Sequence, residues 1–211
     1  MDLDPDRTLA LAYVPAAVRP AVAALWRLDA GFGAILATGT QPLVSQMRLA
    51  WWREALERLD REPPPAEPLL QALAAHVLPT ASGAELAAME EGWLMLLAEE
   101  ALTEAELARY AELRGAQLFV LTARLLGVAD FPVRRAGAAW ALADLARHSR
   151  RAGEVKSPPP ESKTKWPKRL RPLGMLAMLA RRDLERLGRK PERPGSPARI
   201  LRMMQHRISG Y

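Results

Sequence analysis

The chain has 211 residues, a net charge of +6 and 49% hydrophobic residues, which is too high a hydrophobic fraction for a disordered protein. It contains no cysteine, so a disulfide framework, a thiolate nucleophile and a cysteine-ligated metal site are excluded. The N-terminus is acidic, and no uncharged apolar run is long enough to span a bilayer. We therefore expect a cytoplasmic protein with one domain of ordinary size.

Alanine and leucine dominate most of the chain and β-branched residues are scarce, which predicts an all-α fold. Ser82 with Glu85, and Thr103 with Glu106, have the spacing of capping boxes and mark two helix starts. We expect helices over residues 15–37, 42–60, 67–77, 83–101, 104–126, 133–152, 167–187 and 197–207.

The charge is divided unevenly along the chain. Residues 1–146 carry 12 basic and 19 acidic side chains (net −7), whereas residues 147–211 carry 18 and 5 (net +13). A proline-rich stretch, 157–162, follows this change of composition and is typical of a stiff linker or exposed loop. We expect a helical core over 1–153, a linker or loop over 154–166 and a basic helical segment over 167–211.

Residues 47–56 are unusual because two adjacent tryptophans lie between two arginines. On a helix, five mostly apolar residues of this region form one stripe, and we expect this stripe to pack into the core. The residues are Leu43, Met47, Trp51, Ala55 and Leu59. Arg48 and Trp52 lie on a neighbouring face, where the arginine could bind an anion. A cation–π contact without a function is the alternative.

Catalytic and metal motifs are weak. The three histidines have no i, i+4 spacing, and there is no phosphate-binding glycine loop and no serine nucleophile elbow. Glu54 and Glu57, with Asp60, could hold magnesium between helices. However, Arg58 and Arg61 follow the two glutamates at i+4, and this spacing favours exposed ion pairs.

Four segments together resemble the squalene/phytoene synthase family over about residues 9 to 153. The tryptophan segment, Arg48–Leu56, is similar to that family's Arg-x-x-Trp-Trp-Arg-x-x-Leu motif. The other matches are Leu11–Pro15 with Arg19 and Ala23–Trp26, then Glu67–Leu73, then Tyr110, Gly115 and Ala123–Gly127. The resemblance implies a single isoprenoid-synthase-like helical bundle, here shortened at the C-terminus. It also implies that related enzymes bind prenyl diphosphates through magnesium held by two aspartate-rich motifs.

The first aspartate-rich motif is missing. On the alignment that the resemblance implies, its acidic positions fall at Gly33, Ala34 and Ala37. Asp29 is the acidic residue that remains on this helix. One carboxylate cannot form a magnesium cluster that would neutralise a departing pyrophosphate.

The second motif is degenerate as well. Asp144 stands where the family has asparagine, Arg147 is kept, and His148 stands where a carboxylate is expected. Arg147 and His148, with Arg150 and Arg151, form a basic cluster that could hold a phosphate as a cationic clamp. We expect no metal site here.

The matched scaffold with missing carboxylates predicts a non-catalytic family member that binds an isoprenoid, another lipid or a protein. The resemblance extends to the branch that includes a mitochondrial complex I assembly factor. The alternative is a divergent prenyl transferase that condenses prenyl diphosphates head-to-head and needs Mg²⁺. It would require metal ligands other than those aligned above.

The basic C-terminal segment suggests a partner of its own. Apolar residues and arginines are spaced over 173–187 as in an amphipathic helix on an anionic membrane surface. The alternative, which we favour, is that this stretch packs as one of the last helices of the fold. Peripheral membrane contact stays an expectation for the cytoplasmic protein, and nucleic acid is the less favoured partner.

Overall fold

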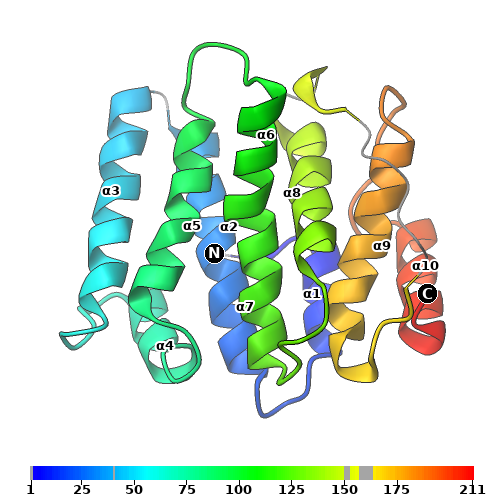
Figure 1. Cartoon of the computed structure of the whole chain (residues 1–211), viewed down its shortest axis with the longest axis horizontal. Helices are drawn as coiled ribbons and strands as arrows, with labels where there is room; N and C mark the ends of the chain where they lie inside the picture. Colours follow the sequence, from blue (N-terminus) through cyan, green and yellow to red (C-terminus); the bar gives the residue numbers. More distant parts are fainter. Residues whose placement is uncertain (1, 40, 150–152, 157–163) are drawn as a thin grey trace.

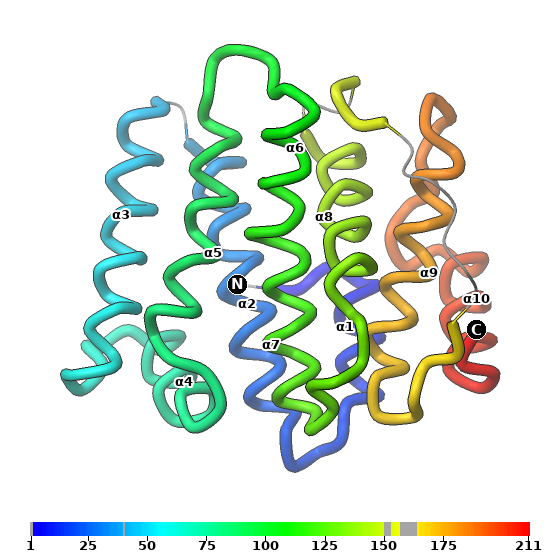
Figure 2. Tube along the Cα trace, viewed as in Figure 1, coloured from blue at the N-terminus to red at the C-terminus, as the bar shows by residue number. Residues whose placement is uncertain are grey.

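The computed structural model describes residues 2–39, 41–149, 153–156 and 164–211, and within these ranges it contains helices and no strand. Helices stand side by side, with α3 and α10 at opposite ends of the molecule (Figures 1 and 2). The α-helices are α1 (Pro5–Ala12), α2 (Arg19–Thr38), α3 (Pro42–Arg58), α4 (Pro68–His76), α5 (Gly83–Met95), α6 (Glu104–Ala111), α7 (Gln117–Leu125), α8 (Arg134–His148), α9 (Arg171–Glu185) and α10 (Pro197–Ser209). The all-α prediction is confirmed.

Most expected helices form close to their expected bounds, and both capping boxes are present, at Ser82 and Thr103. The helix expected over 83–101 ends early, at Met95. Helix α1 was not expected. It begins where the Asp4 carboxylate accepts hydrogen bonds from two backbone amides, with a proline in the first turn.

Helix α2 is long and apolar enough to cross a membrane by length and composition alone. More than half of its apolar window is buried inside the protein, where α2 packs against α4 and α7. This burial is that of a central core helix.

A π-helical turn, η1 (Glu112–Ala116), joins α6 to α7 so that one continuous helix runs from Glu104 to Leu125. This turn crosses α8 at two glycines. A Cβ on Gly115 would lie 2.1 Å from the carbonyl oxygen of Gly137. The two backbones therefore touch, and this contact fixes the turn that carries Arg114 against α8.

The basic C-terminal segment packs against α8 and shares the main apolar core. A short 3-10 turn, η3 (Lys168–Leu170), leads into α9. The apolar side of α9 is buried at Leu173, Leu176, Ala180 and Leu184. This stretch is thus a packed helix of the fold, as we favoured, and its apolar side is not available to a membrane. The central residues of the proline-rich stretch, 157–163, lie outside the described residues.

The core packing predicted for the α3 stripe is wrong for its first three members. Leu43 and Met47 are each 66% exposed and Trp51 is 50% exposed, whereas Ala55 and Leu59 are buried. The reason is that α3 lies at the end of the bundle and packs against α5. It contacts its neighbours through a different face, which includes Leu49 and Leu56.

Candidate active site

Asp29 lies in the middle of α2 and is completely buried. Its Oδ1 accepts hydrogen bonds from Arg114 Nε at 2.9 Å and Trp93 Nε1 at 3.1 Å. Its Oδ2 accepts from Arg7 Nη1 at 2.9 Å and Arg114 Nη2 at 3.2 Å. Four hydrogen bonds use about all the acceptor positions that a carboxylate has.

Arg114 joins the two degenerate motifs. From the π-helical turn, its Nη2 also donates to Asp144 Oδ2 on α8, at 2.6 Å. The guanidinium lies over the Trp93 ring, with its Cζ 3.9 Å from the ring centroid, and Nη1 donates to the Tyr110 hydroxyl. A buried arginine therefore bridges Asp29 and Asp144 through charge-assisted hydrogen bonds.

The charges in this cluster, Arg7 and Arg114 against Asp29 and Asp144, balance one another. Burial by itself would raise the pKa of each aspartate, but the charge of Arg114, the charge of Arg7 and the hydrogen bonds that the carboxylates accept together outweigh it and hold both below their usual range. Burial would lower the pKa of Arg114, but Asp29, Tyr110 and Asp144 together outweigh it and raise this pKa. Burial raises the pKa of Tyr110 to about 12, so the phenol stays protonated.

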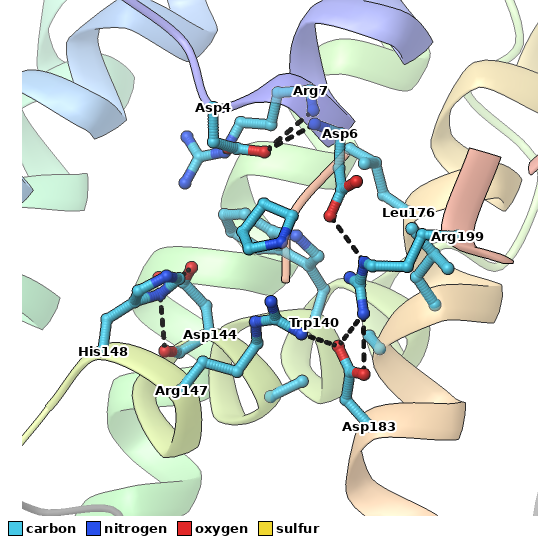
Figure 3. Close-up of a pocket in the computed structure, with 14 residues that line it drawn as sticks. Asp4, Asp6, Arg7, Trp140, Asp144, Arg147, His148, Leu176, Asp183 and Arg199 are labelled. Atoms are coloured by element: carbon cyan, nitrogen blue, oxygen red, sulfur yellow. Dashed lines mark hydrogen bonds and ion pairs between the residues drawn. The ribbon is translucent and has the colours of Figure 1, made fainter. Parts of the chain in front are cut away.

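The other residues of the second motif face a small cavity (Figure 3). His148 Nδ1 lies 3.1 Å from Asp144 Oδ1, and this hydrogen bond raises the pKa of the histidine. Arg147 turns away from Asp144 and donates to Asp183 Oδ2 on α9 at 2.9 Å. It also donates to the backbone carbonyl of Glu192.

A second network of ion pairs lies beside the Arg114 cluster and holds α1, α9 and α10 together (Figure 3). Asp6 accepts a hydrogen bond from Arg199 Nε at 2.8 Å, and Arg199 Nη1 contacts both oxygens of Asp183. Asp183 thus has two arginine partners, Arg147 and Arg199. The arginine kept from the second motif is part of a structural ion-pair chain.

The residues present do not fit magnesium. The oxygens of Asp29 are taken by nitrogen donors, and the described residues contain no cluster of three histidine, aspartate or glutamate side chains that could hold a metal ion. A Cβ on Gly33, one of the expected acidic positions, would come within 2.9 Å of the Trp93 ring. The indole therefore fills the space that an acidic side chain would need.

Two cavities lie near the C-terminal end of α8. The first, lined by the residues of Figure 3, holds about 40 Å³, enough for a water molecule or two. The second, between α8 and the loop after α9, holds about 250 Å³ and is lined in part by Arg186, Arg189 and Lys190. Both are smaller than the roughly 300–1,000 Å³ typical of small-molecule sites.

The structure brings together Asp29, Asp144, Arg147 and His148, four positions taken from the degenerate motifs. Arg48 and Arg53 lie on the exposed surface of α3, at one end of the bundle, and Trp52 packs against Phe32 instead of joining this cluster. Arg150 and Arg151 lie outside the described residues.

Sequence reasoning missed the arginines that hold this cluster, Arg7 and Arg114. The sequence does contain a weak indication for Arg114. This charged residue lies four positions after Tyr110, on the same face of the expected helix, and small residues are close to it in the sequence. Nothing in the local pattern indicates that its partners lie 85 and 30 residues away.

Comparison with known proteins agrees with this architecture. The family model described as squalene/phytoene synthase matches residues 2–155, well over half of the chain. No curated protein and no solved structure gives a significant match. The matched region includes α1 to α8 and therefore Asp29, Arg114 and Asp144. The chain belongs to the squalene/phytoene synthase family.

Proposed function

We propose that this family member does not ionise prenyl diphosphates and that it acts by binding. The observation that carries the proposal is the bridge from Arg114 to Asp29 and Asp144. Metal-dependent ionisation needs carboxylate oxygens that are free to bind magnesium, which in turn neutralises the leaving pyrophosphate. Here Arg114 binds both carboxylates from within the protein, and its hydrogen bonds are all directed to protein groups.

The basic cluster at the end of α8 does not replace the metal. Arg147 is committed to Asp183 and to a backbone carbonyl, and His148 is paired with Asp144. A phosphate would have to displace these partners before it could bind there. Neither residue is arranged to stabilise charge on a departing pyrophosphate.

The binding role that we favour is on the surface. The two cavities described above are too small for a prenyl chain with its diphosphate, so an isoprenoid ligand in a tunnel is the weaker proposal. A protein partner, as in an assembly factor, or a lipid surface needs no internal tunnel. We place this activity in the cytoplasm, with peripheral attachment to a membrane.

The test is pyrophosphate release from farnesyl and geranylgeranyl diphosphate, with and without Mg²⁺ and a reductant. We expect no release above the buffer control from protein shown to be folded by circular dichroism. Titration calorimetry with MgCl₂ should likewise show no binding.

The divergent prenyl transferase makes opposite predictions. Magnesium-dependent release that disappears in the Asp29→Asn or Asp144→Asn variant would establish catalysis at this site and overturn the proposal. Release that both variants retain would also overturn it, and would place the metal ligands elsewhere in the chain.

A further inference from the structure

Helix α10 is inverted with respect to an ordinary surface helix. Its core side carries two polar residues, Arg199 and His206, which are buried together with Met203. Its outward side carries Leu201, 61% exposed, and Ile208, 80% exposed. A helix at the surface of a globular protein normally turns its apolar side inward. Here the apolar side chains of the outward face are exposed to solvent, which is typical of a surface that binds a partner or a membrane.

The burial of Arg199 explains the inversion. Its guanidinium pairs with Asp6 on α1 and with Asp183 on α9, at 2.8 Å in each case. These ion pairs fix the rotation of α10 about its axis. Leu201 and Ile208 lie on the opposite side of the helix and are therefore held in solvent.

The rim of this face is aromatic and basic. Arg207 lies over the exposed Tyr13 ring, with 5.3 Å between its Cζ and the ring centroid. Lys165 Nζ lies 5.7 Å from the centroid of the exposed Tyr211 ring. Tyrosine side chains with cationic neighbours are typical of the boundary between lipid headgroups and acyl chains.

The charge of the surrounding segment is mostly positive, although Arg199 is buried against Asp6 and Asp183 and Arg202 pairs with Glu192. Residues 193–211 contain four arginines and no aspartate or glutamate, and residues 164–211 as a whole carry 13 basic and three acidic side chains. Such a segment is attracted to anionic lipid and is repelled by a second copy of itself.

We propose that the outer face of α10, defined by the exposed side chains of Ile200, Leu201 and Ile208, docks on an anionic lipid surface. The apolar side chains enter the headgroup region while the arginines and lysine around them contact lipid phosphates. Nucleic acid would use the basic rim alone and would leave the apolar centre exposed. This surface is separate from the Arg114 cluster, so the inference does not depend on the absence of catalysis.

Sedimentation with vesicles tests the proposal. The full chain is mixed with vesicles of phosphatidylcholine alone, or of phosphatidylcholine with phosphatidylserine, at low and high salt. We expect binding only to the anionic vesicles, weakened by high salt. The double variant Leu201→Ser/Ile208→Ser should bind these vesicles about tenfold less tightly or worse, because its apolar contribution is lost.

The matched control is Leu43→Ser/Met47→Ser on α3, which removes two equally exposed apolar side chains at the other end of the bundle. It should bind like the wild type. Since both pairs are exposed, circular dichroism melting should show all proteins folded. As a second variant, Arg193→Glu should weaken binding to the anionic vesicles, because it replaces a positive charge with a negative one.

Three results would overturn the proposal. The first is no binding to anionic vesicles, and the second is equal loss in the α3 control. The third is a wild-type dimer in light scattering that the α10 double variant dissociates, because a second copy would then cover this face.

Discussion

Arg114 supplies, inside the protein, the positive charge that bound metal supplies to carboxylates in a metal-dependent enzyme. Its side chain is 1% exposed and its partner Asp29 is completely buried. An ion pair at this depth is expensive to desolvate, and it is stable only because nearly every donor and acceptor has a partner. Removing one member therefore leaves an uncompensated charge in the core.

The Arg114→Met variant should lose about 3–5 kcal/mol of unfolding free energy, because Asp29 and Asp144 would remain charged without their shared partner. Urea denaturation monitored by circular dichroism measures this loss. The double variant Arg114→Met/Asp29→Asn should regain part of it, because one buried charge is removed with its partner.

The control is Arg109→Met, five residues earlier in the same continuous helix. This arginine is 64% exposed and pairs with Glu91 at the surface. Its loss should cost about 0–1 kcal/mol. Equal effects of the two substitutions would mean that the buried bridge contributes no more than a surface pair.

The bridge also sets the pH dependence of stability. Burial by itself would raise the pKa of Asp144. The pairing with Arg114 and the other partners of this carboxylate overcome that effect, so its folded pKa lies below its unfolded value of about 4. The stabilisation is therefore fully present above about pH 4 and is lost as the pH falls through the folded pKa. The stability difference between the wild type and Asp144→Asn should be largest near pH 5, shrink below about pH 4, and also decrease above about pH 6.5, where His148, whose pKa Asp144 raises, loses its proton.

Urea denaturation across this pH range measures the difference. The exposed Asp130 supplies the control variant, Asp130→Asn, which should show almost no difference from the wild type at any pH. A difference for Asp144→Asn that grows as the pH falls below about 4 would contradict the assigned direction of its pKa.

At this scale the sequence predicted the acidic half of the cluster. Asp29 and Asp144 were found because they lie near the positions of two family motifs, and both lie in the buried network. Arg114 was not found, because its role depends on the packing of η1 against α5 and α8, which brings its side chain to Asp29 on α2. Its two partners are far away along the chain, and no periodicity within one helix reports such a pairing.

At the scale of helices, the caps and the spacing of apolar residues predicted where most elements lie, because these signals are local. Which face of a helix is buried was harder to predict. The first three residues of the α3 stripe and the outer face of α10 are apolar, yet both are exposed. Helices at the ends of a bundle have neighbours on one side only, and Arg199 rotates α10 by pairing beneath it.

The crossing of η1 and α8 gives a prediction at this scale. A Cβ on Gly137 would lie 2.3 Å from the carbonyl oxygen of Gly115, a distance that needs backbone movement. Gly137→Ala should destabilise the protein by about 2–3 kcal/mol, because the two elements must separate. Thermal and urea denaturation measure the loss.

Gly31 in α2 provides a matched control, because a Cβ there meets nothing within 4 Å. Gly31→Ala should stabilise the protein by roughly 0.5–1 kcal/mol through its higher helix propensity. If both alanine variants were stabilised, the close contact at Gly137 would not exist in solution.

For the whole molecule, the division of charge has a structural consequence. The acidic first part and the basic last part are joined where Arg199 on α10 pairs with Asp6 on α1. Beside this pair, Arg147 at the end of α8 and Arg199 share Asp183 on α9. These contacts join α1, α8, α9 and α10 (Figure 3). The change of composition that suggested a boundary therefore coincides with an interface in the same core.

This interface predicts that α9 and α10 unfold together with the rest of the bundle. Hydrogen exchange measured by mass spectrometry in increasing urea should show peptides from α2, α8, α9 and α10 losing protection at one midpoint. The Arg199→Met variant should lower the midpoint of α10 first, because the buried Asp6 and the partly buried Asp183 lose a shared partner while α2 keeps its contacts. Arg181→Met on the exposed side of α9 is the control and should leave all midpoints close together. Early exchange of α9 and α10 in the wild type, with α2 and α8 still protected, would show that the basic segment is an independent unit and that the ion-pair chain contributes little to holding it.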